Sequence, residues 1–206
     1  MKFKEWEPLY KTIISEFGYS EEEDRKAAEV LADIRENDGI TPLSGMKGRE
    51  VVVSGPYYSH FNSDFIIAAG SSLEQMVDKG AEPELIVTDL DGDTDLQCEM
   101  NMNGIPVMMH AHGDNIDLIK KWGKRFEGHV IPTCQCDPGD KNLYNFGGFT
   151  DGDRAAFAAE HFGAEKIILN GWDFKDPYQG GKTKRKKLRW AEKLLEEIDV
   201  PVETYP

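Results

Sequence analysis

The sequence predicts an α/β fold with an open, mainly parallel sheet and helices on both faces, preceded by a helical N-terminal segment. Short β-branched runs alternate with amphipathic stretches along most of the chain. The amphipathic stretches end at or near glycine, and the first forty residues carry apolar positions at helical spacing. Alternation of this kind is typical of βαβ units, in which helices cover both faces of a parallel sheet.

The N-terminal segment predicts two helices. The apolar positions of the first are Trp6, Leu9, Ile13 and Phe17, and those of the second are Ala27, Val30, Leu31 and Ile34. Ser20 is followed three residues later by Glu23, which is a capping-box pattern for the start of the second helix. We expect residues 1–45 to form a helical appendage to a single α/β catalytic domain over residues 46–206.

Six runs predict strands, and three stretches between them predict helices. The strand runs are "EVVVS" (50–54), "DFIIAA" (64–69), "ELIVT" (84–88), "IPVMM" (105–109), "HVIPT" (129–133) and "KIILN" (166–170). The helical stretches are "SSLEQMVDKG" (71–80), "NIDLIKKWGKRF" (115–126) and "TDGDRAAFAAEHFG" (150–163). Residues 134–148 have loop composition throughout, and a loop of that length in a compact domain is often functional. A further stripe at helical spacing comprises Leu188, Ala191, Leu195 and Ile198.

The composition restricts the class of partner. The chain of 206 residues has 38 acidic and 24 basic residues, for a net charge of −14, which opposes binding to nucleic acid or to an anionic membrane. Its three cysteines do not suggest a set of disulfide bonds, so we expect the protein to reside in a reducing cellular compartment. The N-terminus has no apolar signal region and no run approaches the ~20 apolar residues of a membrane span, so we expect a soluble, cytoplasmic protein. The helical N-terminal segment is a candidate surface for a homodimer.

Acidic clusters follow the predicted strands. "TDLDGD" follows "ELIV", "HAHGDN" follows "IPVMM" and "GWDF" follows "KIILN", whereas "FTDGDRA" opens a helix. Ligands of open parallel sheets bind beyond the carboxyl ends of the strands, where these clusters fall. The carboxylates expected around one crevice are Asp89, Asp91, Asp93, Asp114, Asp151, Asp153 and Asp173. Mg²⁺, which prefers hard oxygen ligands, would neutralise such a cluster.

Several of these acidic residues have a structural alternative. Asp151 and Asp153 follow Thr150 in the first turn of a helix, where carboxylates satisfy free amides and the helix dipole. Asp93 could join a metal site or cap the following helix, and the sequence leaves this open. Asp89 and Asp91 favour a metal loop, because they leave a buried strand beside a glycine.

The basic residues concentrate in "GGKTKRKKLRW" (180–190). Lys184 continues the helical apolar stripe one turn toward the N-terminus. The start of this helix, with Lys182, Lys184 or Lys187, is predicted to bind phosphate. Lys186 and Arg189 fit a solvated basic face about equally well.

Two short motifs resemble the motifs of hydrolase families. "TDLDGDT" approaches the haloacid-dehalogenase phosphatase pattern, with Asp89 as nucleophile, but Asp93 stands where a threonine is expected and at least two strands precede the motif. "HAHGDN" approaches the metallo-β-lactamase zinc motif, but Asn115 replaces its last histidine. Neither pattern is complete.

A third resemblance includes more of the chain. "TDLDGD", "HAHGDN", "NFGGFTDGDRA", "GWDF" and the K-x-x-K-L of residues 184–188, in this order, resemble the archaeal 6-hydroxymethyl-7,8-dihydropterin pyrophosphokinase family of methanopterin biosynthesis. The catalytic domain of that family is related to thiamine pyrophosphokinase. The resemblance extends over about residues 64–195. It departs at "SGPYYSH" (54–60), where relatives tend to read G-x-G-P-S, and at "IIAAGSS" (66–72), which lacks an expected acidic residue.

The resemblance implies a Mg²⁺-dependent diphosphotransferase that moves diphosphate from ATP to the pterin hydroxymethyl group and releases AMP. The implied metal ligands are Asp89, Asp91, Asp114 and Asp151, with Asp93 or Asp153 for a second metal shell. The implied phosphate ligands are Lys184, Lys187, Lys182 and Arg154. If a general base is needed, His112 and Asp114 are the candidates. Asn115, Asn145, Thr150 and Asp173 are candidates for the pterin edge, and Phe146, Phe149 and Trp172 for stacking. A thiamine-type kinase and a binding module without turnover remain alternatives.

Overall fold

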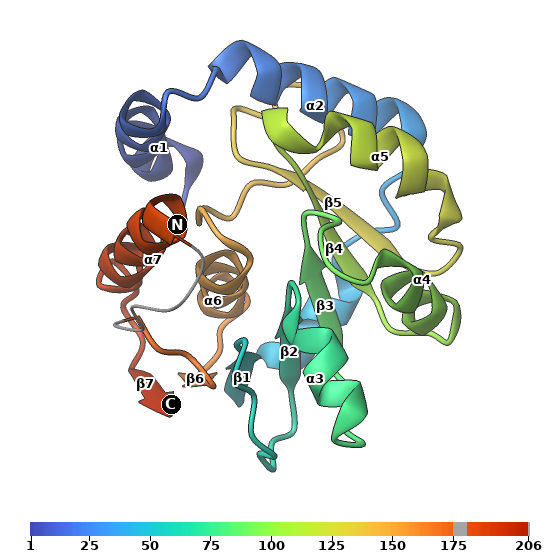
Figure 1. The fold of residues 1–206 in the computed structure, drawn as a ribbon, viewed down its shortest axis with the longest axis vertical. Coiled ribbons are helices and arrows are strands. Elements are labelled where there is room, and N and C mark those ends of the chain that lie inside the picture. The colour runs from blue at the N-terminus through green and yellow to red at the C-terminus, as the bar shows by residue number, and fades with distance from the viewer. Residues whose placement is uncertain (175–180, 206) are drawn as a thin grey trace.

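A seven-stranded, all-parallel open sheet forms the centre of the computed structural model, which describes residues 1–174 and 181–205 (Figure 1). The strand order is β5-β4-β3-β2-β1-β6-β7. The strands are β1 (Glu50–Ser54), β2 (Ile66–Ala69), β3 (Leu85–Thr88), β4 (Val107–Ala111), β5 (Val130–Cys134), β6 (Lys166–Asn170) and β7 (Val202–Tyr205). Every neighbouring pair is parallel, which confirms the predicted fold class.

Helices cover both faces of the sheet. They are α1 (Phe3–Phe17), α2 (Glu21–Ile34), α3 (Ser72–Asp78), α4 (Thr94–Met102), α5 (Ile116–Trp122), α6 (Asp151–His161) and α7 (Gly181–Leu195), with short 3-10 turns η1 (Thr41–Met46), η2 (Gly113–Asn115) and η3 (Gly123–Arg125). Figure 1 shows α6 and α7 on one side of the strands and α3 and α4 on the other. Among the described residues, none of these helices has the length and apolar character needed to cross a membrane.

The predicted elements are confirmed with small shifts of their ends, whereas one α-helix, one strand and the short 3-10 turns were not predicted. Helix α4 is largely polar, so its sequence lacks a clear apolar stripe. Strand β7 lies at the edge of the sheet and has no fully buried residue, so it lacks the continuous apolar run of an interior strand.

The two N-terminal helices belong to the same hydrophobic core as the sheet. Trp6, Tyr10 and Ile13 of α1 are buried in one cluster with the strand residues. Helix α2 packs against α5, β4 and β5. Its N-terminus is capped by the Ser20 hydroxyl, which accepts the Glu23 N–H at 3.4 Å. The division of the chain at residue 45 into appendage and domain therefore stays a prediction, and both parts share the core.

The topology brings most of the polar loops to one edge of the sheet. The chain moves outward from β1 to β5, then crosses back through α6 to β6, which pairs with β1. Ligand crevices form at the carboxyl edge of a sheet wound in this way. The loop after β3 turns sharply there, with Leu90 at φ 71° and Gly92 at φ 76°. Polar side chains from several strand ends can therefore reach a common space.

Candidate active site

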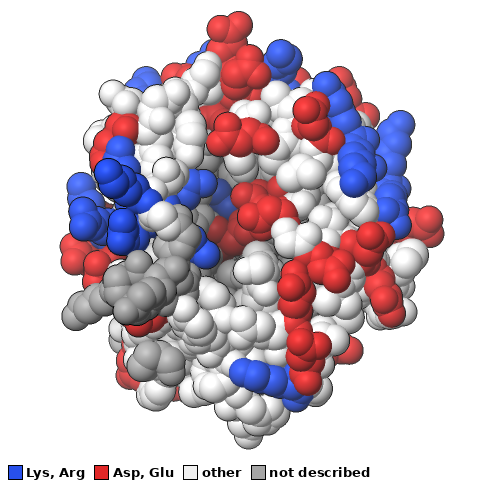
Figure 2. All heavy atoms as spheres, in the orientation of Figure 1, with Lys and Arg blue, Asp and Glu red and all other residues white. Residues whose placement is uncertain are grey.

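A cavity of about 780 Å³ opens at the carboxyl edge of the sheet. Loops that follow the first six strands line it, together with the first turns of α6 and α7 and the connection between α1 and α2. Figure 2 shows acidic side chains in a central hollow of the surface, with lysine and arginine side chains gathered on one side. A volume of this size suits a small organic ligand.

Three carboxylates meet in this cavity. Asp89 and Asp91 come from the loop after β3, and Asp151 is the first residue of α6. One oxygen from each lies within 4.8 Å of the other two. Such an all-oxygen donor set fits Mg²⁺, which often keeps water and substrate phosphate as further ligands. Of the four predicted metal ligands these three form a cluster, whereas Asp114 is exposed on the cavity wall outside it.

The carboxylates perturb one another's pKa values in the absence of a cation. Burial favours a higher pKa for Asp89, but the hydrogen bond from His112 and the charge of Arg154 hold that pKa below its ordinary value. Burial and the charge of Asp89 raise the pKa of Asp91 to about 6. The same two causes raise the pKa of Asp151 well above its ordinary value. A cation bound between them would relieve this repulsion.

His112 holds the first carboxylate in place. Its Nε2 lies 3.2 Å from Asp89 Oδ2, while its Nδ1 accepts the backbone N–H of Asp114 at 3.2 Å. Because Nδ1 accepts, the ring proton lies on Nε2 and is donated to Asp89. Both ring nitrogens are thus engaged, which fits an orienting role better than that of a general base.

Asn115 supports the same loop from behind the cavity. Its Nδ2 donates to the carbonyl oxygens of Asp89 and His110, each at 2.7 Å. Its Oδ1 accepts the backbone N–H of His112 at 3.0 Å. The side chain is buried and outside the cavity wall, so its amide is used within the protein. Asn145 is used similarly, because it donates to the carbonyl oxygens of residues 135 and 136.

The two acidic residues in the first turn of α6, Asp151 and Asp153, have different surroundings. Asp153 caps the helix by accepting the N–H of Thr150 at 2.9 Å and of Phe149 at 2.5 Å, and it also bonds the Thr150 hydroxyl. Thr150 lines the cavity, whereas Asp153 is buried outside its wall. Arg154 is also buried, and its Nη1 lies 2.8 Å from Asp151 Oδ1. Arg154 therefore supports a cluster carboxylate from outside the cavity wall.

Asp93 has a capping contact as well. Its Oδ1 accepts the Leu96 N–H at 3.0 Å at the start of α4, and the side chain is exposed. Of the two alternatives that the sequence left open, the structure shows the cap. Asp173 is not part of the cavity wall.

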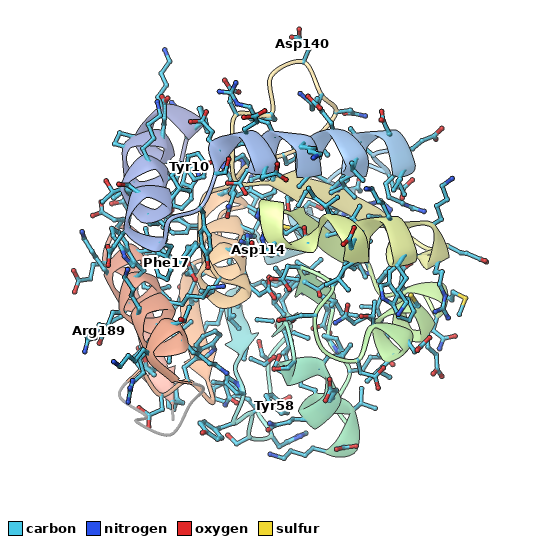
Figure 3. The ribbon with its side chains drawn as sticks, turned by 45° about the horizontal axis from the view of Figure 1, so that its top comes forward. Tyr10, Phe17, Tyr58, Asp114, Asp140 and Arg189 are labelled. Carbon is cyan, nitrogen blue, oxygen red and sulfur yellow. The ribbon has the colours of Figure 1, made fainter. Side chains whose placement is uncertain are left out.

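Two lysines of α7 contribute to the cavity wall. Lys184 and Lys187 line it, and the charge of Lys187 partly offsets the rise in the pKa of Asp91 that burial and Asp89 cause. The Lys187 ammonium lies 5.6 Å from the ring centre of Phe149. Lys182, the third predicted phosphate ligand, lies instead at a separate hollow on the outer face of α7. Arg189 lies at that outer hollow too and points away from the fold in Figure 3.

Of the predicted stacking residues, Phe149 and Trp172 line the cavity. The Trp172 indole N–H donates to the Val53 carbonyl at 3.0 Å, which fixes the ring. Phe146 packs in the core instead, with ring centres of Tyr144 and Phe162 at 5.6 and 5.3 Å.

Sequence reasoning missed two parts of the wall. The first is the loop after β2, with Gly70 and Ser71, which the strand-end rule could have included. The second comprises Tyr19 of the α1–α2 connection and Asp24 in the first turn of α2, together with Gln135. No local signal marks the connection, because it reaches the cavity only through tertiary packing.

Comparison with known proteins gives the family. The family model of MptE-like 6-hydroxymethylpterin diphosphokinases matches residues 58–179. A 6-hydroxymethyl-7,8-dihydropterin pyrophosphokinase of Pyrococcus furiosus is 40% identical, over 95% of this chain and 94% of the relative. Proteins of the same description from Methanocaldococcus jannaschii (35% identical, 98% of each chain) and Methanothermobacter thermautotrophicus (29%, 97% and 96%) also match. The chain belongs to the MptE-like 6-hydroxymethylpterin diphosphokinase family.

Proposed function

We propose that this protein transfers diphosphate from ATP to the hydroxymethyl group of 6-hydroxymethyl-7,8-dihydropterin and releases AMP. One observation carries this function: the cluster of Asp89, Asp91 and Asp151 lines the same cavity as Lys184 and Lys187. Membership of the family and the near full-length relatives support the pterin as acceptor.

The cavity offers separate means of holding the phosphates and the metal. Lys184 and Lys187 would bind the phosphate oxygens of ATP through charge-assisted hydrogen bonds. The three clustered carboxylates would hold Mg²⁺, which when bound supplies neutralisation of the phosphate charge. His112 and Arg154 keep two of these carboxylates oriented by the contacts described above.

The reaction joins the hydroxymethyl oxygen to the β-phosphorus and breaks the bond from that phosphorus to the oxygen that leaves with AMP. Positioning of the two reactants would supply most of the rate. The acceptor hydroxyl loses its proton, and the exposed carboxylate of Asp114 on the cavity wall is available to take it. Phe149 and Trp172 offer apolar surface for the flat pterin ring.

A product assay tests the function. The protein is incubated with ATP, Mg²⁺ and 6-hydroxymethyl-7,8-dihydropterin. The products are then separated by chromatography and identified by mass spectrometry. We expect AMP and a pterin that has gained two phosphates. ADP or inorganic phosphate as the sole product would refute the proposal.

Two control substrates distinguish the proposed activity from a thiamine-type kinase and from a phosphatase. Thiamine in place of the pterin tests a thiamine-type kinase, and faster turnover with thiamine would reassign the acceptor. A simple phosphate monoester tests a phosphatase that uses Asp89 as nucleophile. The matched variants are Asp89→Asn, expected to lose activity, and Asp140→Asn, which makes the same change at an exposed loop position far from the cavity (Figure 3).

A further inference from the structure

Asp24 is a buried carboxylate that links the N-terminal helices to the active site. It lies on α2 with 2% of its surface exposed. Its Oδ1 accepts the backbone N–H of Gly113 at 2.7 Å. Its Oδ2 accepts the Tyr10 hydroxyl at 2.7 Å and the Gln135 amide at 2.9 Å. The two oxygens thus face different partners, one in the loop after β4 and the others in α1 and after β5.

Gly113 belongs to the loop that orients the metal-binding carboxylate Asp89. The residue before it, His112, donates to Asp89 Oδ2, and Asn115 donates to the Asp89 carbonyl. A shift of this loop would therefore move both of these hydrogen bonds to Asp89, which also accepts the N–H of Asp91. The Asp24 contact holds the loop at the point between these two donors.

The packing of α2 on this loop is close. A Cβ atom at Gly113 would lie 2.8 Å from the Cβ of Glu23, nearer than such atoms approach in proteins. The first turn of α2 therefore lies directly against the loop. Figure 3 shows Tyr10 between α1 and α2, and its hydroxyl donates to the Asp24 oxygen that does not accept from Gly113. The position of α2 sets the position of the loop because no space separates them.

We propose that Asp24 is a positioning residue for Asp89, acting through Gly113 and His112, so that helix α2 helps to shape the active site. Its effect on turnover rests on the proposed function. Its effect on metal binding does not require ATP or a pterin. Residues that orient metal ligands in this way affect metal affinity or activity by roughly 10- to 100-fold when replaced.

The test compares substitutions on the two sides of the carboxylate. Asp24→Asn replaces one of the two accepting oxygens with an NH2 group, so the three donors around this side chain, the Gly113 N–H among them, compete for a single oxygen. Tyr10→Phe is the matched control, because it removes a donor from Oδ2 and leaves the Gly113 contact intact. For each folded protein, Mn²⁺ affinity is measured by electron paramagnetic resonance without ATP, and kcat and KM are measured with ATP and 6-hydroxymethyl-7,8-dihydropterin. Thermal unfolding is recorded alongside.

We expect Asp24→Asn to weaken Mn²⁺ binding and lower kcat by roughly 10- to 100-fold. Tyr10→Phe should unfold at a lower temperature while keeping the wild-type Mn²⁺ affinity and kcat. A folded Asp24→Asn protein with Mn²⁺ affinity within about twofold of wild type overturns the inference, because loss of a contact that positions a metal ligand has a larger effect. Equal losses in the two variants would also overturn it, because the network would then serve stability alone.

A second substitution covers the case in which Asp24→Asn does not fold. Gly113→Ala must push the loop away from Glu23 and should weaken Mn²⁺ binding in the same way. Wild-type Mn²⁺ affinity in a folded Gly113→Ala protein overturns the inference. If the wild type makes no AMP but the Mn²⁺ affinities differ as expected, the proposed function fails and the role of Asp24 stands. If the wild type binds no Mn²⁺, the metal site and this inference fail together.

Discussion

The most informative perturbation is Asp91→Asn, because it should change stability in opposite directions with and without a divalent cation. Burial and the nearby charge of Asp89 raise the pKa of Asp91 to about 6 in the metal-free protein, from an ordinary value of 3.8. The folded state then binds more protons than the unfolded state between these values. Stability is fully retained below about pH 4 and falls as the pH rises through 6, where the folded carboxyl ionises.

The magnitude follows from the size of this shift. A rise of about two units corresponds to roughly 3 kcal/mol of unfavourable interaction for a fully buried group. Asp91 is exposed at the cavity, and water screens its charge, so we expect about 1 kcal/mol. The metal-free Asp91→Asn protein should therefore melt about 2–4 °C above wild type at pH 7.5 and equally with it at pH 4.

In the presence of Mg²⁺, the wild type should melt at a higher temperature than Asp91→Asn. A ligand that binds only the folded state stabilises it, by about 2.7 kcal/mol at a concentration of 100 times the dissociation constant. The variant lacks one of the three clustered carboxylates, so its melting temperature should rise less than that of wild type.

Differential scanning calorimetry in EDTA and in Mg²⁺ measures both effects, with Asp140→Asn as the control for loss of one exposed charge. A melting temperature of Asp91→Asn below that of wild type in EDTA at pH 7.5 would contradict the predicted repulsion between the carboxylates. An equal rise of both melting temperatures in Mg²⁺ would contradict the role of Asp91 as a metal ligand.

Three further predictions concern phosphate binding and packing. Lys187→Met should raise the KM for ATP in steady-state kinetics by roughly 10- to 100-fold, because a charge-assisted hydrogen bond is lost. The control Arg189→Met, on the outer face of α7, should leave this KM unchanged. Gly152→Ala should destabilise the protein by about 1–3 kcal/mol in urea unfolding, because its Cβ would lie 1.8 Å from the Trp172 ring, and wild-type stability would contradict this packing. Ile13→Ala should cost about 2–5 kcal/mol in a single transition, since Ile13 is buried in the common core, and two separate transitions would instead favour an independent N-terminal unit.

Much of the fold follows from local patterns. Buried parallel strands need continuous apolar runs, so six of the seven strands were visible in the sequence, and the edge strand β7 was not. The acidic loop was predictable for a related reason. Asp89 and Asp91 directly follow β3, and the carboxyl ends of parallel strands share one edge.

The sequence alone could not show which of two residues, two positions apart in a helix, faces the cavity. Such residues point about 200° apart, so only one of Asp151 and Asp153 can face the cavity. The packing of α6 turns Asp151 inward and leaves Asp153 as the cap. The orientation of α7 likewise places Lys184 in the cavity wall and Lys182 at the outer hollow.

Three features could be predicted from the amino-acid sequence: the class of fold, the edge of the sheet that carries the site, and the residue types that meet there. These depend on hydrophobic periodicity and on chain direction, which are local properties. Only the tertiary structure showed that Tyr19 and Asp24 of the N-terminal segment reach the same cavity. Their contacts join segments far apart in the chain, such as Asp24 with Gly113, and they exist because α2 packs against the end of β4 and α5.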